Sequence, residues 1–326
     1  MKHFLLFFLF LFIISCGPSS EHVKLSGPTF GTGYSIQYFS KDGTNYQKQF
    51  DSLFGVINKS LSTYIPDSYI SRLNSGVSNS IDNHFAFVFD SSKAIYDYTN
   101  GAFDPTIGVL VNAWDFGPEK ETVGLDSLKI DSLMSSVGFN KVHRREYKII
   151  KDDAGTFLDF NAIAKGYSVD VIGKFLDSKN IENYLVEIGG EILAKGINTE
   201  KEKPWKVGVE MPHFDGTQSL LRVIDLKDEA MATSGTYRKF KTDINGNRYS
   251  HIIDPHTGYP SKTNLLSISV ITKDCITADA YATAFKAMGM EDVKTFLNKH
   301  KDIKVFLIFE NDKHELETLS LNGFLE

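Results

Sequence analysis

The stretch Thr277-Ala-Asp-Ala-Tyr-Ala-Thr-Ala-Phe-Lys-Ala-Met-Gly289 has the pattern of a helix packed against a core. Thr277 suits the N-cap of a helix, and Gly289 suits the position just past its end. The apolar residues between them recur at helical spacing. The residues that we expect to face the core are Tyr281, Ala282, Phe285 and Met288.

Two polar residues of this stretch, Asp279 and Thr283, are four positions apart and therefore share one face of the predicted helix. A carboxylate beside a hydroxyl offers two oxygens to a hard cation such as Mg²⁺. In a simpler interpretation, Asp279 only complements the positive end of the helix dipole and Thr283 has no special role. The stretch alone leaves both interpretations open.

Composition is that of a soluble globular protein. The chain has 326 residues, of which 42% are hydrophobic and 23% charged, enough for one large domain or two small ones. Its net charge is −6, and it has no long basic run. We therefore expect no nucleic-acid partner.

The N-terminus has the form of an export signal. A cationic start, Met1-Lys2-His3, precedes an apolar run from Phe4 to Ile14 that is too short to cross a bilayer as a helix. The following Ser15-Cys16-Gly17 resembles a bacterial lipobox, in which the cysteine is lipidated and becomes the first residue. The alternative is ordinary cleavage, with Cys16 incidental.

This interpretation divides the chain into a lipoprotein signal peptide at 1–15, a lipid-anchored linker at 16–25 and a catalytic domain at 26–326. After processing, Cys275 is a free thiol without a partner for an internal disulfide. We expect an exported protein that its lipid tethers to a bacterial membrane, most simply on the periplasmic side of the inner membrane.

Helices and strands are predicted in a mixed order. Helical spacing predicts helices over about 50–61, 82–100, 126–137, 162–177, 277–288 and 291–300. Strands are predicted at about 24–39, 184–188, 192–197, 205–210, 220–226, 266–272 and 304–309, and a hairpin joining 147–151 to 156–160. Because strands and helices do not alternate regularly, we expect an α+β class and a single domain with mixed sheets, possibly of two lobes.

Several loops between these elements are rich in Gly, Asp, Ser and Thr. One carries Asp104 after a predicted helix, and another, with Lys165, joins a strand to a helix whose N–H groups could face an anion. A glycine pair lies at Glu187-Ile-Gly-Gly-Glu191, hydroxyls at Thr233-Ser-Gly-Thr-Tyr-Arg238, and His251 before an Asp-Pro turn. Taken singly, each is equally an ordinary bulge, turn or structural residue. Rossmann and Walker signatures are missing.

Taken together and in order, these blocks resemble the ApbE family of flavin transferases. The matching stretches, which cover the chain from about Ser26 to its end, are Thr29-Phe-Gly-Thr-Gly-Tyr34, Leu61-Ser-Thr-Tyr-Ile-Pro-Asp-Ser68, Gly101-Ala-Phe-Asp-Pro-Thr106, Asp159-Phe-Asn-Ala-Ile-Ala-Lys-Gly-Tyr167, Glu187-Ile-Gly-Gly190, Ser234-Gly-Thr-Tyr-Arg238, His251-Ile-Ile-Asp-Pro255 and Thr277-Ala-Asp-Ala280.

The resemblance implies an activity. FAD is split at its pyrophosphate, FMN passes to a threonine hydroxyl of an acceptor protein, and AMP leaves. Acceptors in the family are typically subunits of membrane redox complexes, such as the sodium-pumping NADH:quinone reductase and the Rnf complex. Two other readings stay open: an FAD pyrophosphatase that gives FMN and AMP, and a lipoprotein that binds flavin without turnover.

The resemblance also implies site residues. Asp279, Thr283 and the backbone carbonyl of Ala162 resemble the ligands of Mg²⁺. His251 and Asp279 are the candidates for catalysis. The residues that align with the FAD site are Phe30, Tyr64, Ala102, Phe103, Asp104, Asp159, Lys165 and Ile253. The chain departs from the family at Phe30, where Met is frequent, and at Ile65 and Tyr69, where acidic residues are common.

Overall fold

A computed structural model describes residues 20–119, 125–237, 240–242 and 248–325 of the chain. Its helices are α1 (Gln47–Leu61), α2 (Tyr69–Asn74), α3 (Asn83–Tyr98), α4 (Gly108–Ala113), α5 (Ser127–Met134), the 3₁₀ turn η1 (Phe139–Lys141), α6 (Ala164–Ser178), α7 (Cys275–Met288) and α8 (Met290–Leu297). Its strands are β1 (Glu21–Thr29), β2 (Thr32–Ser40), β3 (Val142–Arg145), β4 (Lys148–Lys151), β5 (Tyr184–Ile188), β6 (Glu191–Lys195), β7 (Trp205–Glu210), β8 (Leu220–Leu226), β9 (Glu229–Gly235), β10 (Phe240–Thr242), β11 (Arg248–Ser250), β12 (Leu265–Thr272), β13 (Lys304–Glu310) and β14 (Leu316–Leu321).

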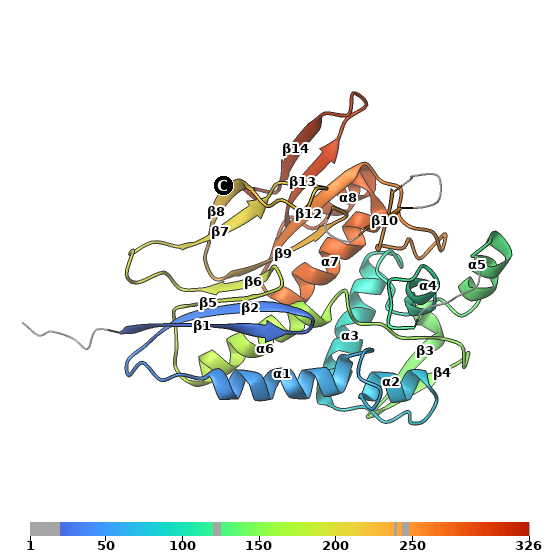
Figure 1. The fold of residues 1–326 in the computed structure, drawn as a ribbon, viewed down its shortest axis with the longest axis horizontal. Coiled ribbons are helices and arrows are strands. Elements are labelled where there is room, and N and C mark those ends of the chain that lie inside the picture. Colours follow the sequence, from blue (N-terminus) through green and yellow to red (C-terminus); the bar gives the residue numbers. More distant parts are fainter. Residues whose placement is uncertain (1–19, 120–124, 238–239, 243–247, 326) are drawn as a thin grey trace, which may run out of the picture.

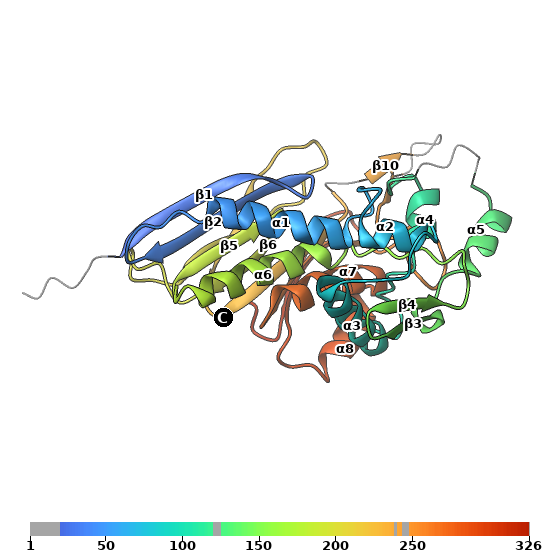
Figure 2. The same ribbon diagram turned by 90° about the horizontal axis from the view of Figure 1, so that it is seen from below.

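One eight-stranded sheet organises the molecule, in the order β1-β2-β5-β6-β9-β12-β13-β14 (Figure 1). The neighbouring strands pair antiparallel. Helices α1, α6 and α7 lie along one face, with α6 packed on β5 and β6 and α7 on β9 and β12 (Figure 2). This architecture confirms the predicted α+β class and single domain.

Alternate residues along the central strands serve two separate cores. On β9, Ala230 and Ala232 face the helices, whereas Met231 faces the opposite side and packs with Trp205 of β7 and Phe306 of β13. This alternation follows from the two-residue period of a strand. The hairpin β7–β8 thus covers the face that the helices leave open, and the central strands β9 and β12 are buried on both sides.

The smaller elements α2 to α5 and the hairpin β3–β4 gather beyond one end of the sheet, as a second lobe (Figures 1 and 2). The predicted hairpin in this region was wrong in its pairing. β4 pairs with the preceding β3, and residue 157 makes only an isolated bridge to Ile107. Glu146, with φ of 52°, supplies the tight turn between the two strands.

Helix α7 confirms the predicted helix at 277–288 and its end at Gly289, whose φ is 83°. Two details of the prediction were wrong. The N-cap is Asp274, whose side chain accepts the Thr277 N–H, so the helix begins earlier than expected. Asp279 does not lie on a solvated polar face, since it is only 4% exposed. Because α7 is enclosed by the sheet and by α3, α6 and α8, it has almost no solvated face.

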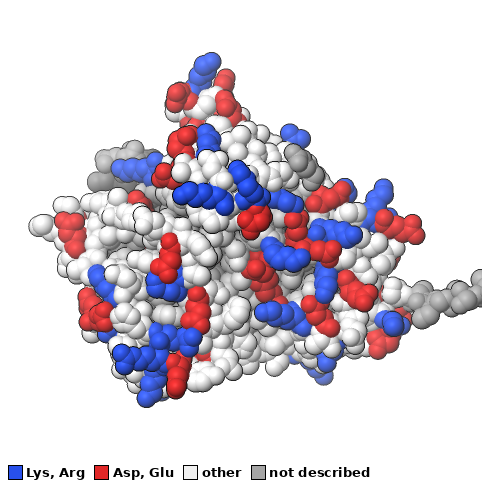
Figure 3. Space-filling model, turned by 180° about the vertical axis from the view of Figure 1, so that it is seen from behind, with Lys and Arg blue, Asp and Glu red and all other residues white. Residues whose placement is uncertain are grey.

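Near the N-terminus, β1 begins at Glu21 and pairs with β2 along its whole length, so residues 21–25 of the expected linker belong to the sheet. Cys16 and the predicted signal peptide lie outside the described residues, and so does Arg238. Among the described helices, none combines the length and hydropathy that crossing a membrane would require. On the face shown in Figure 3, Lys and Arg are interspersed with Asp and Glu.

Candidate functional site

The first turns of α6 and α7 meet at Gly166. A Cβ at this position would lie 2.3 Å from the Cys275 carbonyl oxygen and 2.7 Å from Cβ of Asp279. Both distances are shorter than any real carbon contact, so only glycine permits the two helices to approach this closely. The contact brings together two segments that are 113 residues apart in the chain.

The backbone N–H of Gly166 donates to Oδ2 of Asp279 over 2.9 Å. In a regular helix this N–H would donate to the carbonyl four residues earlier, which belongs to Ala162. Ala162 lies in the turn before α6, and among the described residues no hydrogen bond reaches its carbonyl. The Asp279 carboxylate therefore leaves the Ala162 oxygen free for another partner.

These oxygens suit a hard cation. The free carbonyl of Ala162, the carboxylate of Asp279 and the hydroxyl of Thr283 come from the start of α6 and one face of α7, and oxygen is the ligand that Mg²⁺ prefers. Thr283 lies one turn after Asp279, and its Oγ1 is 3.2 Å from Oγ of Ser234 on β9. Burial raises the pKa of Asp279, while Lys165 and the Gly166 N–H oppose that rise.

Lys165 provides a cation beside Asp279 and forms an ion pair with Glu191, at the start of β6. Burial alone would lower the pKa of Lys165, but Glu191 and Asp279 outweigh it and raise that pKa above its ordinary value. Glu191 is 3% exposed, and burial raises its pKa to about 7. Glu191 was not among the predicted site residues, although its position directly after a glycine pair was a signal in the sequence.

The tight turn between β1 and β2 lies next to this charged cluster. Phe30 is in that turn with φ of 49°, and its ring packs edge-on against Phe54, with centroids 5.5 Å apart. Gly189, with φ of 64°, fits against Thr32 of the turn and the side chain of Lys165. The structure thus places Phe30 on the same side of the sheet as the predicted metal ligands.

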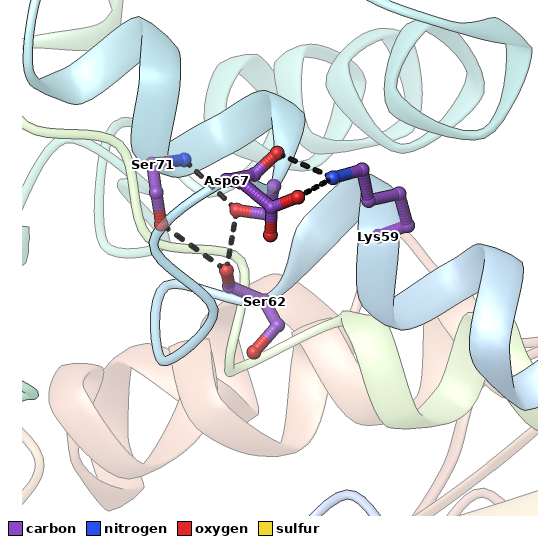
Figure 4. Close-up of polar contacts among 5 residues, drawn as sticks. Lys59, Ser62, Asp67 and Ser71 are labelled. Atoms are coloured by element: carbon purple, nitrogen blue, oxygen red, sulfur yellow. Dashed lines mark hydrogen bonds and ion pairs between the residues drawn. The ribbon is translucent and has the colours of Figure 1, made fainter.

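Tyr64 projects from the loop between α1 and α2 and is 56% exposed. The loop is held at both ends (Figure 4). Nζ of Lys59 donates to the Asp67 carbonyl over 2.8 Å and also pairs with its carboxylate, and Oγ of Ser71 donates to the Ser62 carbonyl over 3.3 Å. An exposed aromatic ring on a fixed loop is a suitable surface for stacking a planar ligand.

The loops that carry Asp104 and Asp159 are joined. The Asp159 N–H donates to the Pro105 carbonyl over 2.7 Å. The Asp104 carboxylate accepts the N–H and hydroxyl of Thr106, at 2.8 and 2.6 Å, and the N–H of Phe139 at 3.2 Å. Burial raises the pKa of Asp104 against these bonds. Its contacts show that Asp104 shapes its own loop.

The remaining predicted FAD residues are distributed around these loops. Burial and, secondarily, the Asp159 carboxylate raise the pKa of Tyr64, so the two side chains influence each other. Ala102 and Phe103 are buried at 6% and 3% exposure, and Phe103 belongs to the core beneath α7. The backbone N–H groups of both residues donate to Thr99, so Ala102 and Phe103 are held by their own loop.

His251 and Ile253 belong to a different neighbourhood. The His251 ring lies against Phe116, with centroids 6.1 Å apart, and Ile253 packs with Leu110 and Ile130 in a small core of the second lobe. The structure thus brings Lys165, Asp279 and the carbonyl of Ala162 together where α6 and α7 meet, with Thr283 one turn further along α7, and it places His251 and Ile253 on the segment that follows β11.

Several known proteins are similar to this chain in sequence and in fold. The model of the ApbE family matches residues 30–307. FAD:protein FMN transferase of Vibrio cholerae is 37% identical over 311 residues, which cover 93% of this chain and 92% of that protein. The FAD:protein FMN transferase of Haemophilus influenzae is 33% identical, and the match covers 93% of this chain and 90% of that protein. The structure of the flavin transferase ApbE from Vibrio cholerae superposes with a TM-score of 0.84 at 35% identity, covering 94% of this chain and 98% of that one.

The flavinyl transferase ApbE of Pseudomonas stutzeri, solved in its apo form, has a TM-score of 0.82 at 29% identity, over 93% of this chain and 95% of that one. These similarities extend over nearly the whole length of each protein. The chain therefore belongs to the ApbE family and is a transferase.

Proposed function

We propose that the protein is an FAD:protein FMN transferase that uses Mg²⁺ to move the FMN part of FAD onto a threonine hydroxyl of an acceptor protein. Support comes from relatives of that name and from the chemistry of the α6–α7 junction. The carrying observation is the Gly166 N–H, which donates to Asp279 and leaves the Ala162 carbonyl unpaired. That arrangement has no purpose in the helix itself but suits a cation between the two segments.

The reaction asks mainly for positioning and charge neutralisation. The hydroxyl oxygen forms a bond to the phosphorus of the FMN half, the bond from that phosphorus to the bridging oxygen breaks, and AMP leaves with that oxygen. Mg²⁺ would neutralise charge on the pyrophosphate from a position held by Ala162, Asp279 and Thr283. The Lys165 ammonium lies beside that position and would stabilise the charge that develops on the phosphate oxygens.

The base that takes the hydroxyl proton is His251 or Asp279. Asp279 already accepts one N–H and lies beside Lys165, which favours its role as a charged ligand. The His251 ring lies against Phe116, and imidazole is the side chain that most often serves as a general base. We therefore assign the role of general base to His251 and the role of cation ligand to Asp279.

A direct test incubates the purified protein with FAD, Mg²⁺ and a candidate acceptor domain, with and without EDTA. Flavin fluorescence that stays with the acceptor in a denaturing gel, with one AMP released per flavin attached, is the expected result. AMP and FMN released equally with and without acceptor would identify a pyrophosphatase instead. FAD that binds but is not cleaved would leave only a flavin-binding protein.

The location of the protein in the cell is a second part of the proposal. We infer an exported protein anchored by a lipid on Cys16, which would bring the site to the acceptor subunits of membrane redox complexes of the sodium-pumping NADH:quinone reductase or Rnf type. The wild type should partition with membranes, whereas Cys16→Ser should be released. Mass spectrometry of the N-terminus decides the matter, since an unlipidated residue other than Cys16 there would contradict the inference.

A further inference from the structure

A second carboxylate joins the same two helices, in the opposite direction to Asp279. Asp170 of α6 is 7% exposed, and its oxygens accept the backbone N–H groups of Cys275, over 2.8 Å, and Ile276, over 2.9 Å. These are the first two residues of α7. Each helix therefore supplies a carboxylate to free N–H groups in the first turn of the other, Asp279 to Gly166 and Asp170 to Cys275 and Ile276.

Capping of α7 does not by itself require Asp170. Asp274, which immediately precedes the helix, already accepts the Thr277 N–H over 3.0 Å in the usual N-cap arrangement. Placing a second carboxylate near it is unfavourable, because burial and the charge of Asp274 both raise the pKa of Asp170. What Asp170 adds, and Asp274 cannot, is a connection from α7 to α6.

The connection sets the position of α7 along its own axis. Asp279 comes one turn after Cys275, so any sliding of α7 past α6 moves both residues equally. A slip of one residue is about 1.5 Å, enough to take Asp279 out of hydrogen-bond distance of Gly166. The Gly166 N–H would then be available to the Ala162 carbonyl again, and two of the three proposed cation ligands would be lost together.

We propose that Asp170 is a positioning residue for the cation site, holding α7 in the register that presents Asp279 to Gly166 and keeps the Ala162 carbonyl free. The proposal rests on the proposed function, in which Asp279 is a cation ligand. Asp274 serves as a matched control, because it binds the same helix end and, within the part of the chain that the structure describes, no hydrogen bond joins it to α6.

The test compares Asp170→Asn with Asp274→Asn, and uses Mn²⁺ as the probe. The Asn amide accepts through only one oxygen, so one N–H of α7 loses its partner. Free Mn²⁺ is measured by its EPR signal in the absence of FAD, well below the melting temperature of each variant. We expect D170N to melt earlier and to weaken Mn²⁺ binding by about 10-fold or more, the scale for groups that orient a ligand. D274N should keep the Mn²⁺ affinity of the wild type, because Asn caps a helix about as well as Asp.

Equal Mn²⁺ affinities in D170N and D274N would overturn the proposal and leave Asp170 a structural cap. If D170N does not fold, Asp170→Glu keeps the charge but lengthens the side chain, and an unchanged Mn²⁺ affinity in D170E would overturn it as well. Failure of the proposed function has a different signature: wild type and Asp279→Ala would then bind Mn²⁺ equally, or not at all.

Discussion

Each half of α7 buries one charged side chain, and the two side chains differ in whether neighbouring groups offset the charge. Asp279, in the first half, is 4% exposed and has the Gly166 N–H and the nearby Lys165 cation to offset its charge. Lys286, in the second half, is fully buried, and Oγ1 of Thr263 at 2.7 Å is the partner of its Nζ. Among the described residues it makes no ion pair.

The difference is the one expected between a proposed cation ligand and a side chain that only packs. Asp279 keeps a compensated charge with a neighbouring carbonyl left unpaired, as a cation site requires. Burial lowers the pKa of Lys286 to about 8, so the ammonium is still mostly charged at pH 7 and its burial without a counter-ion reduces stability. The same helix thus combines a site for charge with an uncompensated charge that reduces stability, and the following predictions test this contrast.

The largest effect on activity is expected from a substitution of Asp279, in the first half of α7. Asp279→Ala removes the one negative ligand proposed for the cation and should reduce AMP release and flavin transfer by about 10²–10³-fold or more. Thr283→Ala removes a neutral oxygen and should cost less. Both rates are measured with thermal melting of the same samples. If D279A kept full activity in the presence of EDTA, Asp279 would not be a cation ligand.

His251→Ala tests whether catalysis also depends on the separate loop. Loss of a general base should reduce the transfer rate by about 10²-fold, while FAD affinity changes much less. Stopped-time assays of acceptor labelling, together with FAD titration followed by flavin fluorescence, give the two quantities. A normal rate would show that His251 is a structural residue packed against Phe116, and Asp279 would then be the candidate for the general base.

Glu191→Gln sharpens the role of the charges around Lys165. The substitution keeps the size of the side chain but removes the carboxylate that pairs with the ammonium, and a rate loss of about 10-fold is expected from the less well oriented Lys165. The assay is AMP release at saturating Mg²⁺, with the FAD dependence recorded. A rate equal to wild type would show that Asp279 alone suffices to place Lys165.

The smallest effect, on stability alone, is expected at the other end of α7. Lys286→Met replaces the buried ammonium with an apolar chain of similar length and should stabilise the protein by about 2 kcal/mol at pH 7, measured by urea unfolding.

This gain has a predicted pH dependence. Because the folded-state pKa of Lys286 lies below its unfolded value, the wild type regains stability as the pH rises from about 8 to 10.5, where the unfolded state binds the extra proton. The advantage of K286M should therefore shrink over this range. An advantage that is constant with pH would mean that the pKa of Lys286 is the same in the folded and unfolded states.

Much of the fold follows from local pattern. The helical spacing of Tyr281 and Phe285 and the glycine at 289 were sufficient to predict α7, and the order of the sequence blocks was sufficient to predict the family. The hairpin at β3–β4 was predicted with the wrong partner for β4, because two candidate strands flank it and alternation alone does not choose between them.

The sequence by itself determined which residues are present for chemistry: a carboxylate and a hydroxyl one turn apart on a helix, and a lysine at the start of another. Tertiary structure alone decided that Asp279 is buried, that Glu191 pairs with Lys165, and that Gly166 gives its N–H to a carboxylate 113 residues away. The physical reason is that helical spacing is a property of a few neighbouring residues, whereas desolvation, pairing and a vacant carbonyl arise only where distant segments pack.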